Sequence, residues 1–209
     1  MVLGYFEWFL TDASSSLDFV FTPLQLLVYS YLAVTCHRIV LLGGGSVPRF
    51  GIRKWTSRET RFFAWLVGIY LTATLTLAML PSLLSPVMEI SGYRIWTVLN
   101  IAAATPVVYL VARLSMIFPA IAVDEHPDIK WAWVISRGNG WRLLVIVGIL
   151  PMITGSVLRL MERADSTLLE DLAVVLISFI VLIIEIVAVS LSYRQLTTGE
   201  SNYAPRPTQ

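Results

Sequence analysis

Arg113 and Glu185 are the residues with the least expected chemistry, because each one interrupts a long uncharged run. Arg113 is the single charge within 95–123, and Glu185 is the single charge within 172–193. A charge inside a membrane span costs about 2.5–3.5 kcal/mol on insertion scales, so such a residue marks a functional site unless a structural partner neutralises it. Counted at ~1.5 Å per helical residue, both lie roughly 15 Å from the same end of their helices. We therefore predict an intramembrane ion pair between them, and the sequence leaves open whether its role is structural or functional.

A basic loop follows the first apolar run and contains three consecutive glycines, Gly43–Gly45. A phosphate-binding loop needs Gly-x-x-x-x-Gly-Lys followed by Ser or Thr, and this loop lacks that order. Glycines directly after a helix more simply end it. We predict that Arg49, Arg53 and Lys54 in the same loop contact anionic lipid headgroups.

The side chains that bind metals or act as nucleophiles are few and scattered. His37 and His126 are the only histidines and Cys36 is the only cysteine, so we expect no metal ion and no cofactor. The acidic and histidine side chains of 124–128 form the one cluster that an enzyme acting on lipids at the interface would use. No serine is marked as an activated nucleophile, and the catalytic residues remain unknown.

The segment 127–137 has the pattern of a short helix that lies on the membrane surface. Pro127 suits a first helical turn, and Trp131, Val134 and Ile135 then share one face. Tryptophan favours the level of the headgroups. We therefore expect Trp131 to contact lipid, and the alternative for this segment is a groove for a ligand or partner.

The composition of the whole chain indicates a membrane protein. Of its 209 residues, 56% are hydrophobic and 14% are charged, whereas soluble proteins are nearer ~45–50% and ~25%. The net charge of +1 gives no reason to expect nucleic acid as a partner. One apolar domain over 1–209 is the simplest organisation, because no aqueous segment is long enough to bury a core of its own.

The apolar runs predict an all-α integral membrane bundle with about five transmembrane helices. A span needs about 20 apolar residues, and none of the runs alternates apolar with polar residues as barrel strands do. Pro81 and Pro86 place the end of the second helix near Leu80. The expected spans lie near 18–37, 61–80, 95–122, 141–159 and 171–194.

The distribution of basic residues predicts the orientation of these helices. Eleven Lys and Arg residues fall on one side of the predicted membrane and three on the other. Because basic residues are enriched in cytoplasmic loops, we expect the N-terminus outside and the C-terminus in the cytoplasm. The eleven residues are Arg38, Arg49, Arg53, Lys54, Arg58, Arg61, Lys130, Arg137, Arg142, Arg194 and Arg206.

Several short stretches resemble a group of bacterial membrane proteins related to the membrane domain attached to some glycerophosphoryl diester phosphodiesterases. The matching stretches are 36–43, 113–115, 119–124, 140–144 and 192–196. The resemblance implies a helical protein of a bacterial inner (plasma) membrane. It implies no activity, because the catalytic barrel of those phosphodiesterases would need about 250 further residues.

Three classes of function fit these observations. The first is a non-enzymatic accessory, scaffold or assembly component that packs its helices against membrane lipids and against a protein partner or a second copy. The second is a small transporter or channel that uses Arg113, Glu185 and helices broken by proline. The third, which the sequence favours least, is an enzyme that modifies lipids.

Overall fold

The computed structural model describes residues 16–47, 54–161 and 168–203, and every regular element within these ranges is helical. Five stretches are long and apolar enough to cross a membrane: Thr22–Leu42, Ser57–Pro86, Arg94–Ala122, Gly140–Leu158 and Leu172–Thr198. The predicted all-α architecture with five candidate spans is therefore confirmed. The elements are α2 (Ser16–Leu42), the 3₁₀ turn η1 (Gly44–Ser46), α3 (Ser57–Leu114), α4 (Ile117–Ala122), α5 (Ile129–Ile135), α6 (Gly140–Leu144), the π-helical turn η2 (Val145–Ile149), α7 (Leu150–Met161) and α8 (Leu168–Tyr203).

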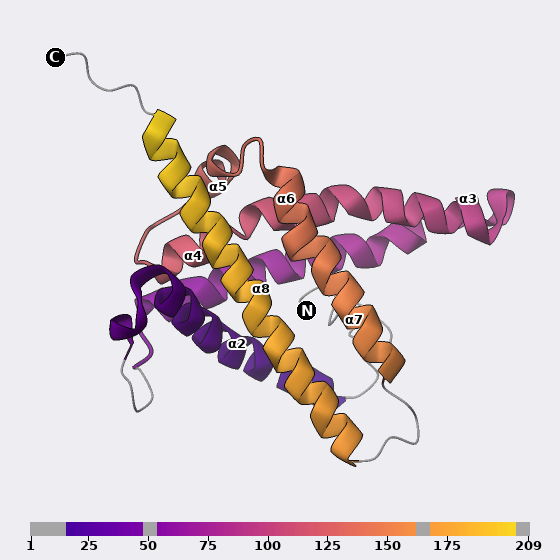
Figure 1. Ribbon diagram of the computed structural model, residues 1–209. Coiled ribbons are helices and arrows are strands. Elements are labelled where there is room, and N and C mark those ends of the chain that lie inside the picture. The colour runs from indigo at the N-terminus through magenta and orange to yellow at the C-terminus, as the bar shows by residue number, and fades with distance from the viewer. Residues whose placement is uncertain (1–15, 48–53, 162–167, 204–209) are drawn as a thin grey trace.

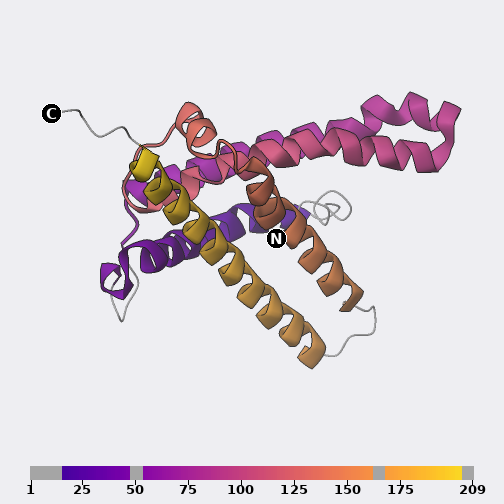
Figure 2. The same cartoon turned by 45° about the horizontal axis from the view of Figure 1, so that its top comes forward.

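α3 contains two of the candidate spans, because the chain folds back on itself and its two arms run side by side (Figures 1 and 2). The predicted helix end near Leu80 is wrong, since helical structure continues through Pro81 and Pro86. Pro86 has no backbone N–H to donate to the carbonyl of Ser82. The hydroxyl of Ser85 donates to that carbonyl at 2.8 Å instead, which keeps the turn hydrogen-bonded.

The end of α2 and the start of α3 show how the sequence sets helix boundaries in the basic loop. Gly43 follows α2 with a φ of 86°, and its N–H donates to the carbonyl of Ile39 at 3.1 Å. Glycine adopts this left-handed conformation without a steric penalty, which confirms the prediction that the glycines end the helix. α3 begins with a capping box in which the backbone N–H of Thr56 donates to Glu59 Oε2 at 2.7 Å.

The helices converge at one end of the molecule and diverge towards the other (Figures 1 and 2). The convergent end contains α4, α5 and α6 together with the C-terminal parts of α2 and α8. Two clusters of buried apolar side chains fill it, so the packing that fixes the fold is concentrated there. The first comprises Ala33, Val34, Phe62, Leu66, Ile117, Ile121, Ala122, Ala132, Leu182 and Ile186; the second comprises Ala112, Met116, Ala120, Ile135, Leu143 and Tyr193.

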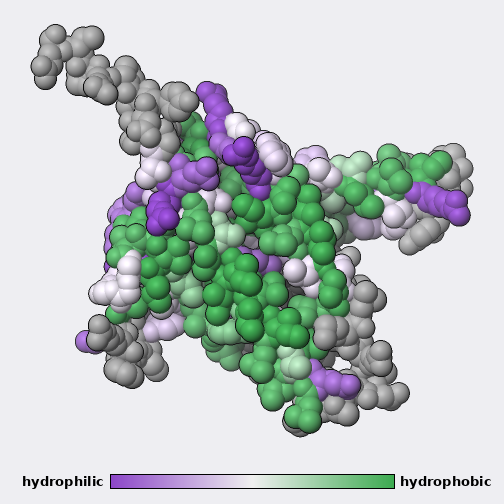
Figure 3. Space-filling view, viewed as in Figure 1, coloured by the Kyte–Doolittle hydropathy of each residue, from purple (hydrophilic) through white to green (hydrophobic). Residues whose placement is uncertain are grey.

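The diverging arms carry large apolar side chains on their outer surfaces. Figure 3 shows a nearly continuous hydrophobic surface over α7 and α8 and along the arm of α3. Exposed examples are Leu83, Val98, Ile101, Ile153, Val157 and Val175. Apolar surface of this extent has no favourable contact with water, and it suits the hydrocarbon interior of a membrane.

α6 and η2 pack closely on the second arm of α3, because two glycines face that arm. A Cβ atom at Gly148 would lie 2.6 Å from Cγ1 of Val108, and one at Gly140 would lie 2.4 Å from Oη of Tyr109. Small residues permit such close approach between membrane helices. The two glycines therefore set the distance between α6 and α3.

Replacing Gly148 with alanine should destabilise the fold by about 1–3 kcal/mol, because the added methyl group overlaps Val108 in a packed interface. Thermal unfolding in detergent measures the loss, and adding Val108→Ala should recover part of it. Gly68→Ala is the matched control, since a Cβ atom there meets nothing within 4 Å. Equal unfolding temperatures for Gly148→Ala and the wild type would contradict the close packing of α6 on α3.

Candidate functional site

The guanidinium of Arg113 is buried at the convergent end, against the last turn of α5. Only 6% of Arg113 is exposed. Its Nε donates to Oγ of Ser136 at 2.7 Å and its Nη2 donates to the carbonyl of Trp133. The guanidinium carbon lies 3.5 Å from the centroid of the Trp133 ring. Carbonyls at a helix C-terminus carry partial negative charge and an aromatic face attracts a cation, so this site stabilises the charge without a carboxylate.

The predicted ion pair between Arg113 and Glu185 does not form in the part of the chain that the structure describes. α8, which carries Glu185, packs chiefly on α2 and less on α7 and η2, whereas the end of α3 that carries Arg113 lies against α5. Equal depth along two helices fixes the height of two side chains but not the direction in which each points. The structure therefore gives Arg113 and Glu185 separate surroundings.

α5 occupies the middle of the segment 127–137, which the sequence assigns to a surface helix. Trp131 packs against both buried clusters, and its ring centroid lies 6.2 Å from that of Tyr193. The side chains of Trp133 and Val134 are exposed instead. Trp131, the expected lipid contact, thus contributes to the core, while the exposed indole of this helix belongs to Trp133.

Arg38, near the end of α2, and Arg58, in the first turn of α3, hold the chain directly after α4. Arg38 Nη1 donates to Oδ2 of Asp124 at 3.0 Å and to the carbonyl of Ala122 at 2.8 Å, while Arg58 Nε donates to Oδ1 of Asp124 at 2.7 Å. Partial burial would raise the pKa of Asp124, but hydrogen bonds from the two arginines outweigh it and hold that pKa below its ordinary range. Arg38 and Arg58 therefore have a structural role, since they fix the position of the chain after α4.

The structure describes one of the three basic residues that the sequence predicts to contact lipid headgroups. Lys54 is exposed, at the start of the chain that leads into α3. Arg49 and Arg53 lie outside the described residues. Of these three residues, Lys54 is therefore the one that the structure places at the surface.

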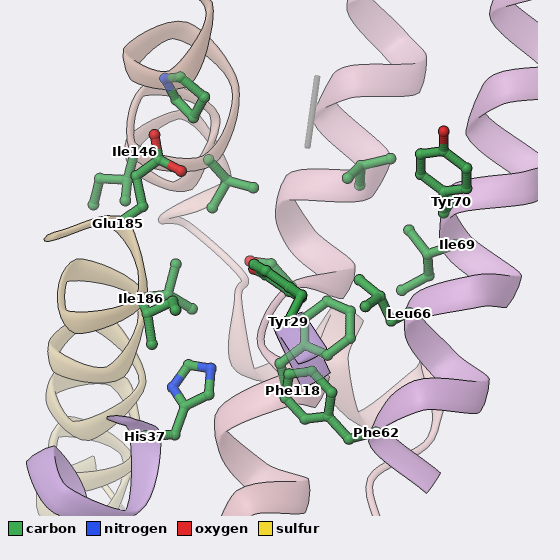
Figure 4. A pocket seen from close by; sticks show the side chains of 15 residues that line it. Tyr29, His37, Phe62, Leu66, Ile69, Tyr70, Phe118, Ile146, Glu185 and Ile186 are labelled. Carbon is green, nitrogen blue, oxygen red and sulfur yellow. The ribbon is translucent and has the colours of Figure 1, made fainter. Parts of the chain in front are cut away.

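A pocket of about 90 Å³ lies among α2, α3, α4, η2, α7 and α8 (Figure 4). Its walls are mainly apolar, but Tyr29, His37 and Glu185 bring polar atoms to it. No lysine or arginine is among the described residues that line it. Figure 4 shows Glu185 and His37 on the side of the pocket formed by α8 and α2, with Tyr29, Phe62 and Phe118 grouped at its centre.

The imidazole of His37 is fixed by a hydrogen bond that determines its tautomer. Its Nδ1 lies 2.7 Å from Oγ of Ser190, and the hydroxyl of Ser190 donates to the carbonyl of Ile186 at 2.8 Å. A hydroxyl has one proton, so Ser190 accepts a hydrogen bond from Nδ1–H of His37. In the neutral ring Nε2 is then an acceptor.

The sequence singled out Glu185 but did not connect it with His37 or Tyr29. One available signal was the spacing of eight residues between Tyr29 and His37, which places both on one face of a helix. The contact of His37 with Ser190 joins residues 153 positions apart, and no local pattern indicates it. Within the described ranges, no group of three or more His, Cys, Asp or Glu side chains has the arrangement of a metal site.

Comparison of the chain with protein-family models, with characterised proteins and with solved structures finds no match. The assignment of a function therefore rests on the geometry of the helices, the buried arginine and the pocket.

The separate surroundings of Arg113 and Glu185 predict that the stability losses of Arg113→Leu and Glu185→Leu add in the double variant, to within about 0.5 kcal/mol. Arg113→Leu alone should cost about 1–3 kcal/mol, because it leaves the buried hydroxyl of Ser136 and the carbonyl of Trp133 without their donor. Unfolding in detergent measures each variant. The positive control is Arg113→Leu combined with Ser136→Ala, whose losses should not add. If the double Arg113/Glu185 variant lost less stability than the sum of the two single losses, that result would support a direct ion pair instead.

Proposed function

We propose that this chain is a non-enzymatic accessory, scaffold or assembly component of a membrane, and that it acts by packing α3 against a transmembrane helix of a partner. The supporting observation is an exposed stripe of small side chains on the first arm of α3. Ala64, Gly68, Thr72 and Thr76 recur at intervals of four residues, and all four are exposed. We call these residues the small-residue stripe.

The stripe has the properties of a helix-packing surface. A Cβ atom at Gly68 would meet nothing within 4 Å, so no other described helix covers this point. The hydroxyl of Thr72 donates to the carbonyl of Gly68 at 2.8 Å, and that of Thr76 donates to the carbonyl of Thr72 at 2.7 Å. With its hydroxyl donors satisfied inside the helix, the stripe presents a face of small side chains that allows close approach of another helix. Gly140 and Gly148 serve the same purpose inside this protein.

The proposed location is a bacterial inner membrane, with the convergent end on the cytoplasmic side. Support comes from the bias in basic residues along the sequence, eleven on the predicted cytoplasmic side against three on the other, and from the sequence resemblance described above. Five crossings then place the N-terminus outside and the C-terminus in the cytoplasm.

Gly68→Leu should abolish partner packing while leaving the fold intact, because its side chain enters open space on the stripe. The measurement is the size and composition of the particle extracted from native membranes in mild detergent. We expect the wild type to carry a stoichiometric partner or a second copy, and Gly68→Leu to migrate alone with an unchanged unfolding temperature. Gly68→Ala, which remains small, is the control. Identical particles for the wild type and Gly68→Leu would refute packing through the stripe.

The proposed orientation predicts on which side of the membrane the connection after α2 and the turn within α3 lie. In a Cys36→Ser background, an impermeant maleimide should label Ser46→Cys only from the cytoplasmic side and Ser85→Cys only from the outside. Ser46 is partly exposed and Ser85 is exposed, and the two lie at or beyond opposite ends of the candidate spans. Labelling of both from the same side would exclude the proposed arrangement of crossings.

A small transporter is the second candidate, and the pocket is the observation that favours it. Glu185 places a carboxylate beside a pocket among six elements, and a π-helical turn followed by Pro151 forms one of its walls. Broken helices of this kind line the binding sites of many transporters. An enzyme that modifies lipids has less support, because two arginines engage Asp124 of its acidic cluster.

A further inference from the structure

We propose that the outer face of α5 binds an anionic phospholipid, whose headgroup is held by Lys130 and Arg137 and whose acyl chains lie against apolar side chains beside them. This face belongs to the leaflet at the convergent end, which is the cytoplasmic leaflet in the proposed orientation. It is separate from the small-residue stripe and needs no protein partner. We call its five exposed residues the α5 face: Ile129, Lys130, Trp133, Val134 and Arg137.

Helical spacing places the α5 face on one side of its segment. Positions 130, 133, 134 and 137 follow one another at i, i+3, i+4 and i+7, which is the spacing of one helix face. Arg137 follows the end of α5, and its N–H donates to the carbonyl of Val134 at 3.0 Å, so the chain keeps its helical path to this point. Ala132, Ile135 and Ser136 are buried on the other side. α5 is thus fixed in the core on one side and open on the other.

The position of α5 suits contact with the surface of a membrane. Figures 1 and 2 show α5 at the outer edge of the convergent end, beyond the ends of the apolar spans. Figure 1 looks nearly along the axis of α5 and across that of α8, so α5 runs crosswise to the spans. A helix in this position lies in the plane of the headgroups, with charged groups in the polar layer and apolar groups towards the hydrocarbon.

The basic side chains of the α5 face have no acidic partner in the described part of the chain. Lys130 and Arg137 are exposed and neither forms an ion pair there. Nearby carboxylates are engaged elsewhere, since Asp124 is held by two arginines and Oδ1 of Asp128 accepts from the backbone N–H of Trp131 at 2.6 Å. The positive charges of the α5 face are therefore free to meet an anion.

A third positive charge lies directly behind the α5 face. The guanidinium of Arg113 stacks on the ring of Trp133, and its hydrogen bonds go to a hydroxyl and a carbonyl, neither of which carries a full negative charge. Because Arg113 is only 6% exposed, solvent and salt screen its charge less than that of a surface arginine. The charge therefore favours an anion outside Trp133, and it selects an anionic headgroup over a zwitterionic one.

The apolar part of the α5 face identifies the anion as a lipid. Ile129 is 56% exposed, Val134 is 55% exposed and Trp133 is 42% exposed. Trp141, at the start of α6, adds a second exposed indole. Inorganic phosphate or a nucleic acid would leave these side chains in water, whereas a phospholipid brings its acyl chains to them and its phosphate to the basic residues.

The probe is dioleoyl phosphatidylglycerol, compared with dioleoyl phosphatidylcholine, which has the same acyl chains and no net charge. Native mass spectrometry of the delipidated chain in detergent gives the dissociation constant of each lipid. We expect phosphatidylglycerol to bind at least about tenfold more tightly, with a preference that falls as salt is added. Equal dissociation constants would overturn the proposal. Displacement of phosphatidylglycerol by equimolar inorganic phosphate would do so too, because it would show that the acyl chains contribute nothing.

Charge variants test whether the preference arises on the α5 face. Lys130→Gln and Arg137→Gln should each weaken phosphatidylglycerol binding by about three- to fivefold and leave phosphatidylcholine binding unchanged. Arg94→Gln is the matched control, since it removes one exposed positive charge at the other end of the second arm of α3. Unfolding temperatures without lipid should be equal for these three surface variants and the wild type. Equal losses of binding in Arg94→Gln and Arg137→Gln would show a general effect of charge and refute the site.

An apolar variant separates the two parts of the proposed contact. Ile129→Gln combined with Val134→Gln should weaken both lipids by a similar factor, about three- to tenfold, because it removes apolar surface and no charge. The preference for phosphatidylglycerol should therefore remain. Unchanged binding of both lipids would place the acyl chains elsewhere and contradict the site.

The α5 face and the small-residue stripe fail separately. Gly68→Leu should keep the preference for phosphatidylglycerol, because position 68 is on the first arm of α3, outside the α5 face. Absence of that preference in a wild type that still carries its partner would refute the α5 face alone. A double variant Lys130→Gln/Arg137→Gln that loses a protein partner but binds phosphatidylglycerol as the wild type does would make the face a protein contact and overturn the lipid proposal.

Discussion

The buried guanidinium of Arg113 imposes the constraint on which the convergent end depends. A charge withdrawn from water needs hydrogen-bond partners, and here it finds them in the last turn of α5 rather than in another charged side chain. This contact draws the connection between α4 and α6 back against α3. Ala132 and Ile135 of α5 are buried in the two apolar clusters of the same region, and α6 starts beside the second arm of α3.

Two consequences follow from fixing the helices at one end. The arms diverge, and no other described helix covers Gly68 in the small-residue stripe on α3. Near the fixed end the helices cross around aromatic side chains and around the irregular turn η2, and their imperfect packing leaves the pocket beside Glu185. A scaffold needs the first feature and a ligand-binding protein needs the second, so the architecture accommodates both.

Several local features followed directly from the sequence. The apolar runs predicted an all-α fold with five candidate spans, and Gly43 ends α2 as expected, because both depend on neighbouring residues alone. The expected end near Leu80 failed because the hydroxyl of Ser85 satisfies the carbonyl that Pro86 cannot reach. Proline removes a donor, but a nearby side chain can replace it, and proline alone does not fix a helix end.

The candidate site shows where prediction from sequence stops. Arg113 and Glu185 were recognised as costly because burial of a charge in an apolar run is visible in one dimension. The partners of Arg113 were not recognised, because the direction in which a side chain points depends on how helices rotate and cross. The sequence by itself determined the number of candidate spans, their polarity pattern and the residues that need compensation. Only the tertiary structure decided that α5 compensates Arg113 and that His37 meets Ser190, because these contacts join segments whose rotation about their own axes is set by packing.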